Sequence, residues 1–309
     1  MLSLDQATIN FDQSSLLLMN VLLAVVMFGV ALDIEVKHFK QLFKQPKLLF
    51  IGVASQFFLL PLLTFLVVLA LKPPASIALG MMMVAACPGG NISNFMSHLA
   101  KGNVALSISL TAFATFFAII MTPFNFQFYS QLYAPTAELV RVIQLDIVTL
   151  ARIVLLILGV PLLLGMLIRY VSPQRASQMS RLLKPLSIIV FLGFVVVACF
   201  NNIAAFEKYL SAVFAYGLVH NLMALLLGFS LAKLFKLSLN NTKTITIETG
   251  IQNSGLGLVL IFTFFDGLGG MALIAAFWGI SHIIFGLGIA SYWSGKNNNS
   301  ESKRSTSYA

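Results

Sequence analysis

The chain has 309 residues, of which 59% are hydrophobic and 9% are charged, and its formal net charge is +9. A soluble domain usually carries about 25% charged residues, so this composition excludes an ordinary soluble protein and is typical of a chain that crosses a membrane several times. The positive charge does not indicate nucleic-acid binding, because the Lys and Arg residues stand in short runs between hydrophobic segments. Cys87 and Cys199 both lie in apolar segments, which excludes a disulfide framework and a Cys/His zinc site.

Nine hydrophobic segments are long enough to span about 30 Å of hydrocarbon. They predict an all-α polytopic membrane protein of about nine transmembrane helices with short connections. In chain order the segments cover residues 14–34, 48–71, 76–100, 103–128, 147–170, 184–205, 209–235, 243–265 and 268–293.

The distribution of basic residues predicts the orientation of these segments. Fifteen Lys and Arg residues fall in every second connection, beginning after the first segment, and in the tail of residues 294–309. The other connections hold three, namely Lys72, Arg141 and Lys208. Because cytoplasmic loops are the basic ones, we expect a cell (inner) membrane protein with its N-terminus outside and its C-terminal tail in the cytoplasm. An odd number of crossings, such as nine, fits this arrangement.

Polar residues and glycines interrupt two of the segments, the third at CPGGNISN (87–94) and the eighth at ETGIQNSG (248–255). An unpaired backbone group in lipid costs several kcal/mol, so such breaks persist only where protein or a water-filled cavity satisfies them. A single Pro-Gly kink is usually structural, but polar groups gather at both breaks and one of them is a carboxylate, Glu248. Two breaks five segments apart predict a transporter with inverted repeats. The N-termini of the half-helices would face an anion, and the unwound carbonyls a cation.

The oxygen-bearing side chains at these breaks indicate a hard cation rather than zinc, copper or iron. One carboxylate among hydroxyl and amide groups suits a monovalent ion better than calcium. A proton carried by Glu248 is the alternative. We expect no enzymatic activity and no catalytic residue, because paired carboxylates, a Ser-His-Asp order and a nucleotide-binding glycine loop are all missing from the sequence.

Four stretches of the chain resemble the bile acid:sodium symporter family: GVASQFFLLP (52–61), CPGGNISNFMSHLAKGNVALS (87–107), LVHNLMALLLG (218–228) and TITIETGIQNSGL (244–256). The resemblance implies a core domain, residues 48–128 and 209–293, that contains two crossed discontinuous helices. It also implies a panel domain, residues 14–34 and 147–205, that moves against the core in alternating access. The implied activity is import of an organic anion coupled to two sodium ions, with no other cofactor.

The resemblance also implies site residues, which we carry over by position. The first sodium site would comprise Ser93, Asn94, Ser107, Thr111 and Glu248. The second would comprise Gln56, Glu248, Gln252 and the main-chain carbonyls of Thr249 and Ile251. The substrate would lie near Asn91, Asn253 and His282.

Some of these residues have a structural alternative. Ser107 and Thr111 are one helical turn apart and can simply bond back to helix carbonyls, and His282 can be a packing histidine. Ile283 stands where some relatives carry a polar residue, so the family name does not assign a bile acid as substrate. A small carboxylate resembling pantoate fits equally well, and the oligomeric state is not predicted.

Two other functions fit part of the sequence. An arsenite-efflux or proton-coupled transporter of the same superfamily would use Cys87 as a metalloid ligand, but the amides at the breaks would then have no role. A non-transporting membrane receptor would bind the ligand without moving it, although the short connections leave little surface for signalling.

Overall fold

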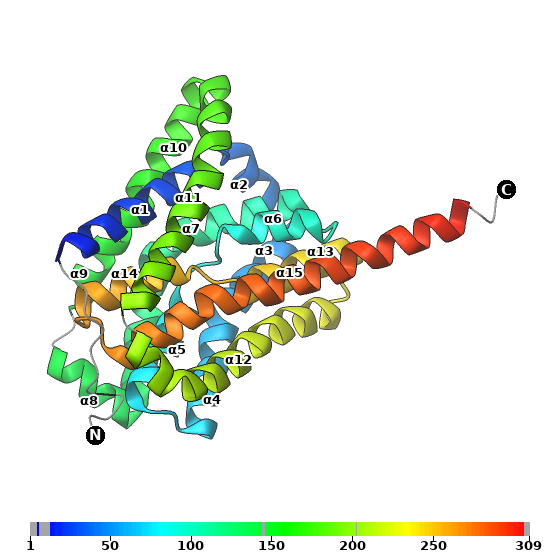
Figure 1. Ribbon diagram of the computed structural model, residues 1–309. Coiled ribbons are helices and arrows are strands. Elements are labelled where there is room, and N and C mark those ends of the chain that lie inside the picture. The colour runs from blue at the N-terminus through cyan, green and yellow to red at the C-terminus, as the bar shows by residue number, and fades with distance from the viewer. Residues whose placement is uncertain (1–4, 6–12, 144–145, 202, 306–309) are drawn as a thin grey trace.

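The computed structural model describes residues 5, 13–143, 146–201 and 203–305, and every element in this part of the chain is a helix (Figure 1). The last four residues of the predicted cytoplasmic tail, 306–309, fall outside the described residues. In chain order the helices are α1 (Gln13–Ala31), α2 (Val36–Phe43), α3 (Pro46–Ala54), η2 (Ser55–Leu59), α4 (Leu60–Leu71), α5 (Ala75–Ala86), α6 (Ile92–Leu99), α7 (Val104–Leu132), α8 (Ala134–Ile143), α9 (Ile147–Val154), η3 (Leu155–Gly159), α10 (Val160–Val171), α11 (Pro173–Asn201), α12 (Ile203–Leu234), α13 (Leu239–Gly250), α14 (Ser254–Phe264) and α15 (Gly269–Ser305).

The all-α, polytopic membrane class predicted from the sequence is confirmed. Within the described residues, five helical stretches are long and apolar enough to cross a membrane, or six if α1 and α2 form one bent span. Each of the nine predicted segments overlaps one helix or consecutive helices, although the segment 184–205 begins inside α11 and extends beyond its end at Asn201. The number of crossings and the orientation of the termini remain predictions.

Two short helices, α2 and α8, were not predicted, because each is amphipathic and too short to read as a span. The chain turns by 69° between α1 and α2. At this turn Glu35 accepts hydrogen bonds from the guanidinium of Arg169 in α10 at 2.7 and 3.2 Å, and it pairs with Lys37 at 2.7 Å. These ion pairs fix the end of α1 against α10.

The two predicted breaks separate α5 from α6 and α13 from α14, and they cross one another at the centre of the protein. The Gly90 N–H donates to the Ile251 carbonyl and the Asn253 N–H donates to the Pro88 carbonyl, each at 2.8 Å. Gly89 and Gln252 thereby form an isolated antiparallel bridge. A Cβ at Gly90 would lie 2.8 Å from the Gln252 carbonyl oxygen, which explains the glycine. Each break therefore supplies hydrogen-bond partners to backbone groups of the other. Such partners are needed because the interior of a lipid bilayer holds no water to bond them.

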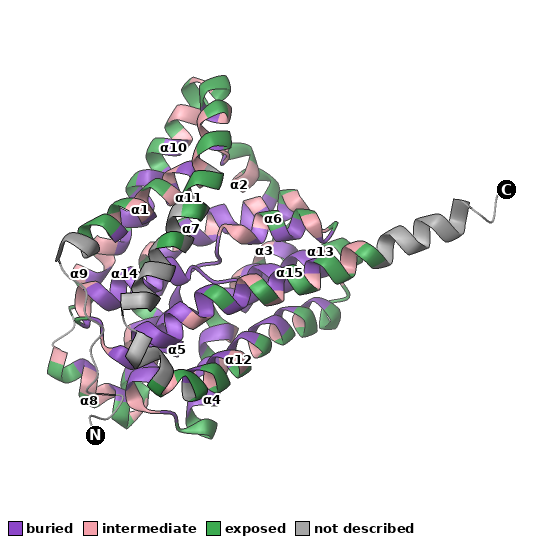
Figure 2. Ribbon diagram, viewed as in Figure 1, coloured by how far each residue is buried: buried purple, intermediate pink, exposed green. Residues whose placement is uncertain are grey.

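Residues at and around this crossing are mostly buried, whereas the outer helices carry many exposed residues (Figure 2). Leu66, Phe116 and Ile120 are each more than half exposed, as expected for side chains that face lipid. On one side α1 packs against α10 and α11, and on the other α12 packs against α13 and α15. Lys243 is one of the fifteen basic residues that the orientation argument assigned to connections, but its side chain is buried in α13 and donates to the Ala100 carbonyl at 2.7 Å.

A π-helical turn, η2, interrupts the span formed by α3 and α4. Pro61 lacks the N–H that would reach the Phe57 carbonyl in a continuous α-helix. The side chain of Asn125 in α7 donates its amide N–H to that carbonyl at 2.8 Å. The π-turn carries Gln56, so Asn125 supports the backbone that presents a predicted sodium ligand.

We expect Asn125→Leu to destabilise the protein by about 1–3 kcal/mol, because it leaves the buried Phe57 carbonyl without a donor. Thermal unfolding in detergent measures this change. The double variant Asn125→Leu with Pro61→Ala restores a backbone donor to the same carbonyl and should recover most of the loss. Equal destabilisation of the single and double variants would contradict this role of Asn125.

Candidate functional site

The carboxylate of Glu248 lies near the end of α13, is 3% exposed and accepts hydrogen bonds from three hydroxyl groups. Ser93 of α6 donates at 2.7 Å, and Thr111 of α7 lies 3.2 Å from each carboxylate oxygen. Ser107 of α7 also donates to the carboxylate. Thr111 lies 3.3 Å from the Asn94 amide oxygen, which completes the set predicted for the first sodium site.

The structure removes the local alternative for Ser107 and Thr111. Other hydroxyls on α7, those of Ser109 and Thr115, bond back to carbonyls four residues earlier at 2.7 and 2.8 Å. The hydroxyls of Ser107 and Thr111 instead donate to the carboxylate of Glu248. The break between α5 and α6 places Ser93 in the first turn of α6, directly beside the same carboxylate.

Five side chains from three helices, including the charged Glu248 itself, therefore lie together in one buried cluster. They offer carboxylate, hydroxyl and amide oxygens and no sulfur or imidazole, which is the donor set that a hard cation prefers. A hydroxyl that now donates a hydrogen bond also has lone pairs, so it can turn them toward a cation. The cluster can hold a small monovalent cation that neutralises Glu248.

The residues predicted for the second sodium site lie on the other side of Glu248. The Gln56 amide N–H approaches the Glu248 carbonyl at 3.3 Å, and the Gln252 amide N–H donates to the Thr249 carbonyl at 2.9 Å. The carbonyl of Ile251 accepts the hydrogen bond from Gly90, and a carbonyl oxygen with a second lone pair can still contact a cation. The buried amide oxygen of Gln252 has no hydrogen-bond partner among the described residues, so this group is available to an ion.

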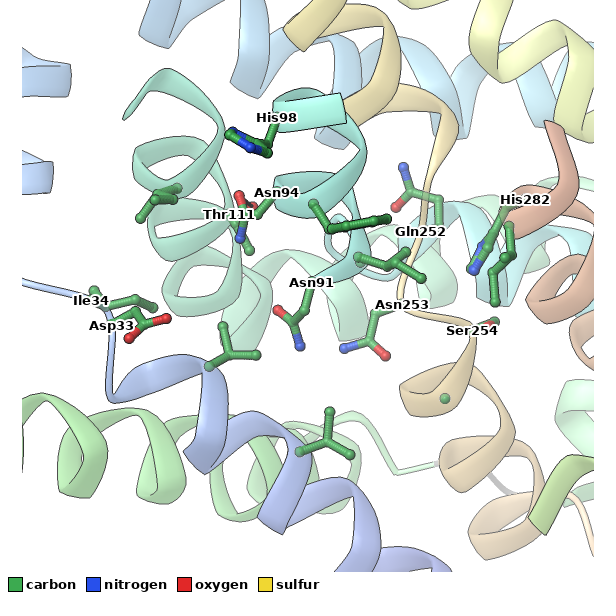
Figure 3. A pocket seen from close by; sticks show the side chains of 18 of the residues that line it. Asp33, Ile34, Asn91, Asn94, His98, Thr111, Gln252, Asn253, Ser254 and His282 are labelled. Carbon is green, nitrogen blue, oxygen red and sulfur yellow. Dashed lines mark hydrogen bonds between the residues drawn. The ribbon is translucent and has the colours of Figure 1, made fainter. Parts of the chain in front are cut away.

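A cavity of about 540 Å³ lies beside the crossing (Figure 3). Leu23, Val26 and Val30 of α1 line one side of it. The other side is formed by residues of α6, α7, α14 and α15 and by the two breaks that precede α6 and α14. The three residues predicted to bind the substrate all line the cavity: Asn91, Asn253 and His282.

The ion cluster and the cavity adjoin one another, since Asn94 and Thr111 belong to both. Neither Lys nor Arg occurs among the described residues that line the cavity, where the charged or titratable side chains are Asp33, His98 and His282. An anion bound here would therefore depend on amide groups and helix N-termini rather than on a cationic side chain.

Two helix N-termini reach this cavity, those of α6 and α14. Asn253 caps α14, since its amide oxygen accepts the Leu256 N–H at 3.0 Å. The partial positive charge at a helix N-terminus favours an anion. The backbone N–H groups of Gly90 and Asn253 already bond across the two breaks, so ligand contacts fall to side chains and to later N–H groups.

Several contributing residues were not predicted as ligands. Asn221 of α12 donates to the Gly250 carbonyl at 3.0 Å, which satisfies the end of α13. Ser55 of the π-turn lies 3.0 Å from the Thr249 hydroxyl. Met27 of α1 contacts both Asn91 and Asn253. No signal in the sequence singled out Met27, and only the folded chain shows that it meets the crossing.

Cys87 does not have the environment that the arsenite alternative requires. Its side chain is fully buried, and it is not among the residues that line the cavity. The described part of the chain holds no group of three or more His, Cys, Asp or Glu residues that could bind a metal ion. The oxygen cluster at Glu248 is therefore the better candidate for an ion site.

Comparison with known proteins identifies similar sequences. The sequence model of the Sodium Bile acid symporter family matches residues 20–209. A Bacillus subtilis (strain 168) protein named "Uncharacterized sodium-dependent transporter YocS" is 32% identical over 276 residues, which cover 89% of this chain and 83% of that protein.

Two eukaryotic relatives are longer than this chain. The mouse protein "Sodium/bile acid cotransporter 5" is 34% identical over 266 residues, and the Arabidopsis thaliana protein "Probable sodium/metabolite cotransporter BASS1, chloroplastic" is 30% identical over 277 residues. These matches cover 84% and 88% of this chain but only 58% and 65% of the respective relatives. The chain therefore spans less than two thirds of each of these two proteins.

Proposed function

Because this chain belongs to the Sodium Bile acid symporter family, we propose that it is a sodium-coupled symporter that imports an organic monoanion by alternating access. The observation that carries the proposal is the buried Glu248 carboxylate. It gathers oxygen ligands from two other helices, α6 and α7, directly beside a cavity that the N-termini of α6 and α14 face. An ion site and an anion site that share Thr111 and Asn94 have a direct route for coupling.

The first sodium ion would bind between Glu248 and the hydroxyls of Ser93, Ser107 and Thr111. It would neutralise the carboxylate and hold α6, α7 and α13 together. A second ion at Gln56, Gln252 and the carbonyls of Thr249 and Ile251 would add one positive charge behind the crossing. Two cations beside one carboxylate leave a net positive charge, which favours an anion in the adjoining cavity. The coupling is reciprocal, so the bound anion also strengthens sodium binding.

The cavity favours a substrate with one negative charge and an apolar body. Its recognition groups are the amides of Asn91 and Asn253 and helix ends that each carry about half a unit charge. No Lys or Arg lines it in the described residues, and Asp33 disfavours a second anionic group. The apolar side chains of α1 would contact the body of the substrate. A bile acid-like molecule and a small carboxylate resembling pantoate both meet these criteria.

We assign α1, α9, η3, α10 and α11 to the moving panel and the helices of the crossing to the core. The cavity lies between α1 and the crossing, so movement of the panel would open or close it. Asp33 and His98 line one end of the cavity, and both adjoin connections that the distribution of basic residues assigns to the cytoplasm. With that orientation in a cell (inner) membrane, this end of the cavity faces the cytoplasm, and the protein is in an inward-facing conformation.

Uptake into vesicles tests this proposal. Vesicles that contain the purified protein should accumulate pantoate or cholate when sodium is high outside, and the same potassium gradient should produce no accumulation. Accumulation driven by an inward proton gradient without sodium would favour the proton-coupled alternative. Sodium-dependent binding without accumulation would favour a receptor.

A further inference from the structure

The side chain of Met27 in α1 contacts both asparagines of the candidate anion site. Its sulfur lies 3.4 Å from the amide nitrogen of Asn91 and 3.7 Å from the amide nitrogen of Asn253. Met27 is 3% exposed and lies on a buried face of α1 together with Met19 and Leu23. That face packs against α14, the helix that Asn253 caps.

The hydrogen bonds of Asn253 fix which end of its amide meets Met27. Its oxygen accepts the Leu256 N–H, so its nitrogen points away from α14 and toward the sulfur. Figure 3 shows the nitrogen ends of Asn91 and Asn253 turned toward one another beside the cavity. Two N–H₂ groups from two different breaks therefore share a single acceptor.

A thioether sulfur is a weak acceptor, and buried amide donors are stabilised far more by a charged oxygen. The side chain of Met has three rotatable bonds and adapts to new surroundings, so it can leave this position without movement of the backbone. The amide oxygen of Asn91 has no hydrogen-bond partner among the described residues, so Asn91 is held chiefly by the sulfur contact. The Met27 sulfur, a weak acceptor, therefore occupies the position that a carboxylate oxygen would take in an anion subsite.

We propose that the thioether of Met27 competes with the substrate carboxylate for the amide groups of Asn91 and Asn253. When the carboxylate binds, it displaces the sulfur and removes one contact between α1 and the crossing. When the sulfur returns, it lowers the affinity for the anion and promotes its release. This inference rests on the proposed import of a carboxylate and adds a residue that sets affinity and turnover.

Two substitutions with opposite expected signs test the competition. Met27→Leu keeps the volume and removes the acceptor, so calorimetric titration with pantoate or cholate at saturating sodium should show about two- to tenfold tighter binding, the effect of one neutral hydrogen bond. Met27→Gln supplies a stronger acceptor and should weaken binding by a similar factor. In vesicle uptake Met27→Leu should lower both KM and the maximal rate, because the anion leaves more slowly.

Met19→Leu is the matched control, because Met19 lies two turns earlier on the same buried face and is 2% exposed. It should change anion affinity by less than about twofold, within the range expected for volume-conserving substitutions. If Met27→Leu and Met27→Gln shift affinity in the same direction, Met27 acts through packing and the inference is wrong, whereas the transport proposal stands. If the wild type neither binds nor accumulates either carboxylate in sodium, both proposals fail.

Discussion

Glu248→Gln should abolish sodium-driven uptake, with a loss of at least about 100-fold, the scale expected when one member of a buried charge pair is removed. Glutamine keeps the shape of the side chain but not its charge. The three hydroxyls that converge on this carboxylate would then have no negative group to share with a cation. Initial uptake rates in vesicles measure the loss.

The variant should remain folded, because an uncharged amide is easier to bury than a carboxylate. Thermal unfolding in sodium and in potassium provides a readout that needs no substrate. A bound ion raises the apparent stability of the folded state, so the wild type should unfold at a higher temperature in sodium and Glu248→Gln should not. A sodium-dependent stabilisation that persists in the variant would show that the ion binds elsewhere.

Ser109→Ala is the matched control for this experiment. Ser109 is a buried hydroxyl on α7 between Ser107 and Thr111, but it bonds back to the Ala105 carbonyl at 2.7 Å. Its removal should leave uptake and the sodium-dependent stabilisation within about twofold of the wild type, because a local back-bond contributes little to a helix. Loss of sodium dependence in Ser109→Ala would mean that any disturbance of α7 impairs transport.

The two breaks and the buried carboxylate were predictable from the sequence, because the hydrocarbon of a membrane offers no hydrogen-bond partners to polar groups. A membrane span cannot carry glycines, amides and a carboxylate at its centre unless other protein groups satisfy them. The runs at 87–94 and 248–255 therefore indicated both the breaks and their crossing from the sequence and its family resemblance. Glu248 was singled out for the same reason, since it is an ionisable residue inside a hydrophobic segment.

Contacts between distant segments were less predictable. Pro61 in a span signals a distorted turn, but nothing local indicates that Asn125 supplies the missing donor. Lys243 reads as a loop cation that marks the cytoplasmic side, whereas its side chain folds back to the Ala100 carbonyl at the end of α6. Met27 looks like an ordinary apolar residue of α1 in the sequence. Its role depends on Asn91 and Asn253, which lie far along the chain, so no local pattern indicates it.

Asn253→Asp should separate anion binding from sodium binding. An aspartate oxygen can still accept the Leu256 N–H, and Asp is as good an N-cap as Asn, so α14 should keep its start. The substitution replaces the N–H₂ group that faces Asn91 with a second carboxylate oxygen. That oxygen repels an anion and attracts a cation. Sodium affinity should therefore be equal to or higher than that of the wild type.

Anion affinity of Asn253→Asp should fall by about 100-fold, because a like charge directly opposite a bound anion costs several kcal/mol. Asn253→Ser also keeps a capping oxygen but adds no charge. It should weaken binding of the anion by only about tenfold, the upper range for the loss of one neutral hydrogen bond. Calorimetric titration with pantoate or cholate at saturating sodium, followed by titration with sodium alone, measures both affinities. If Asn253→Asp binds the carboxylate as the wild type does, the anion lies away from the crossing, nearer His282 and the apolar residues of α1.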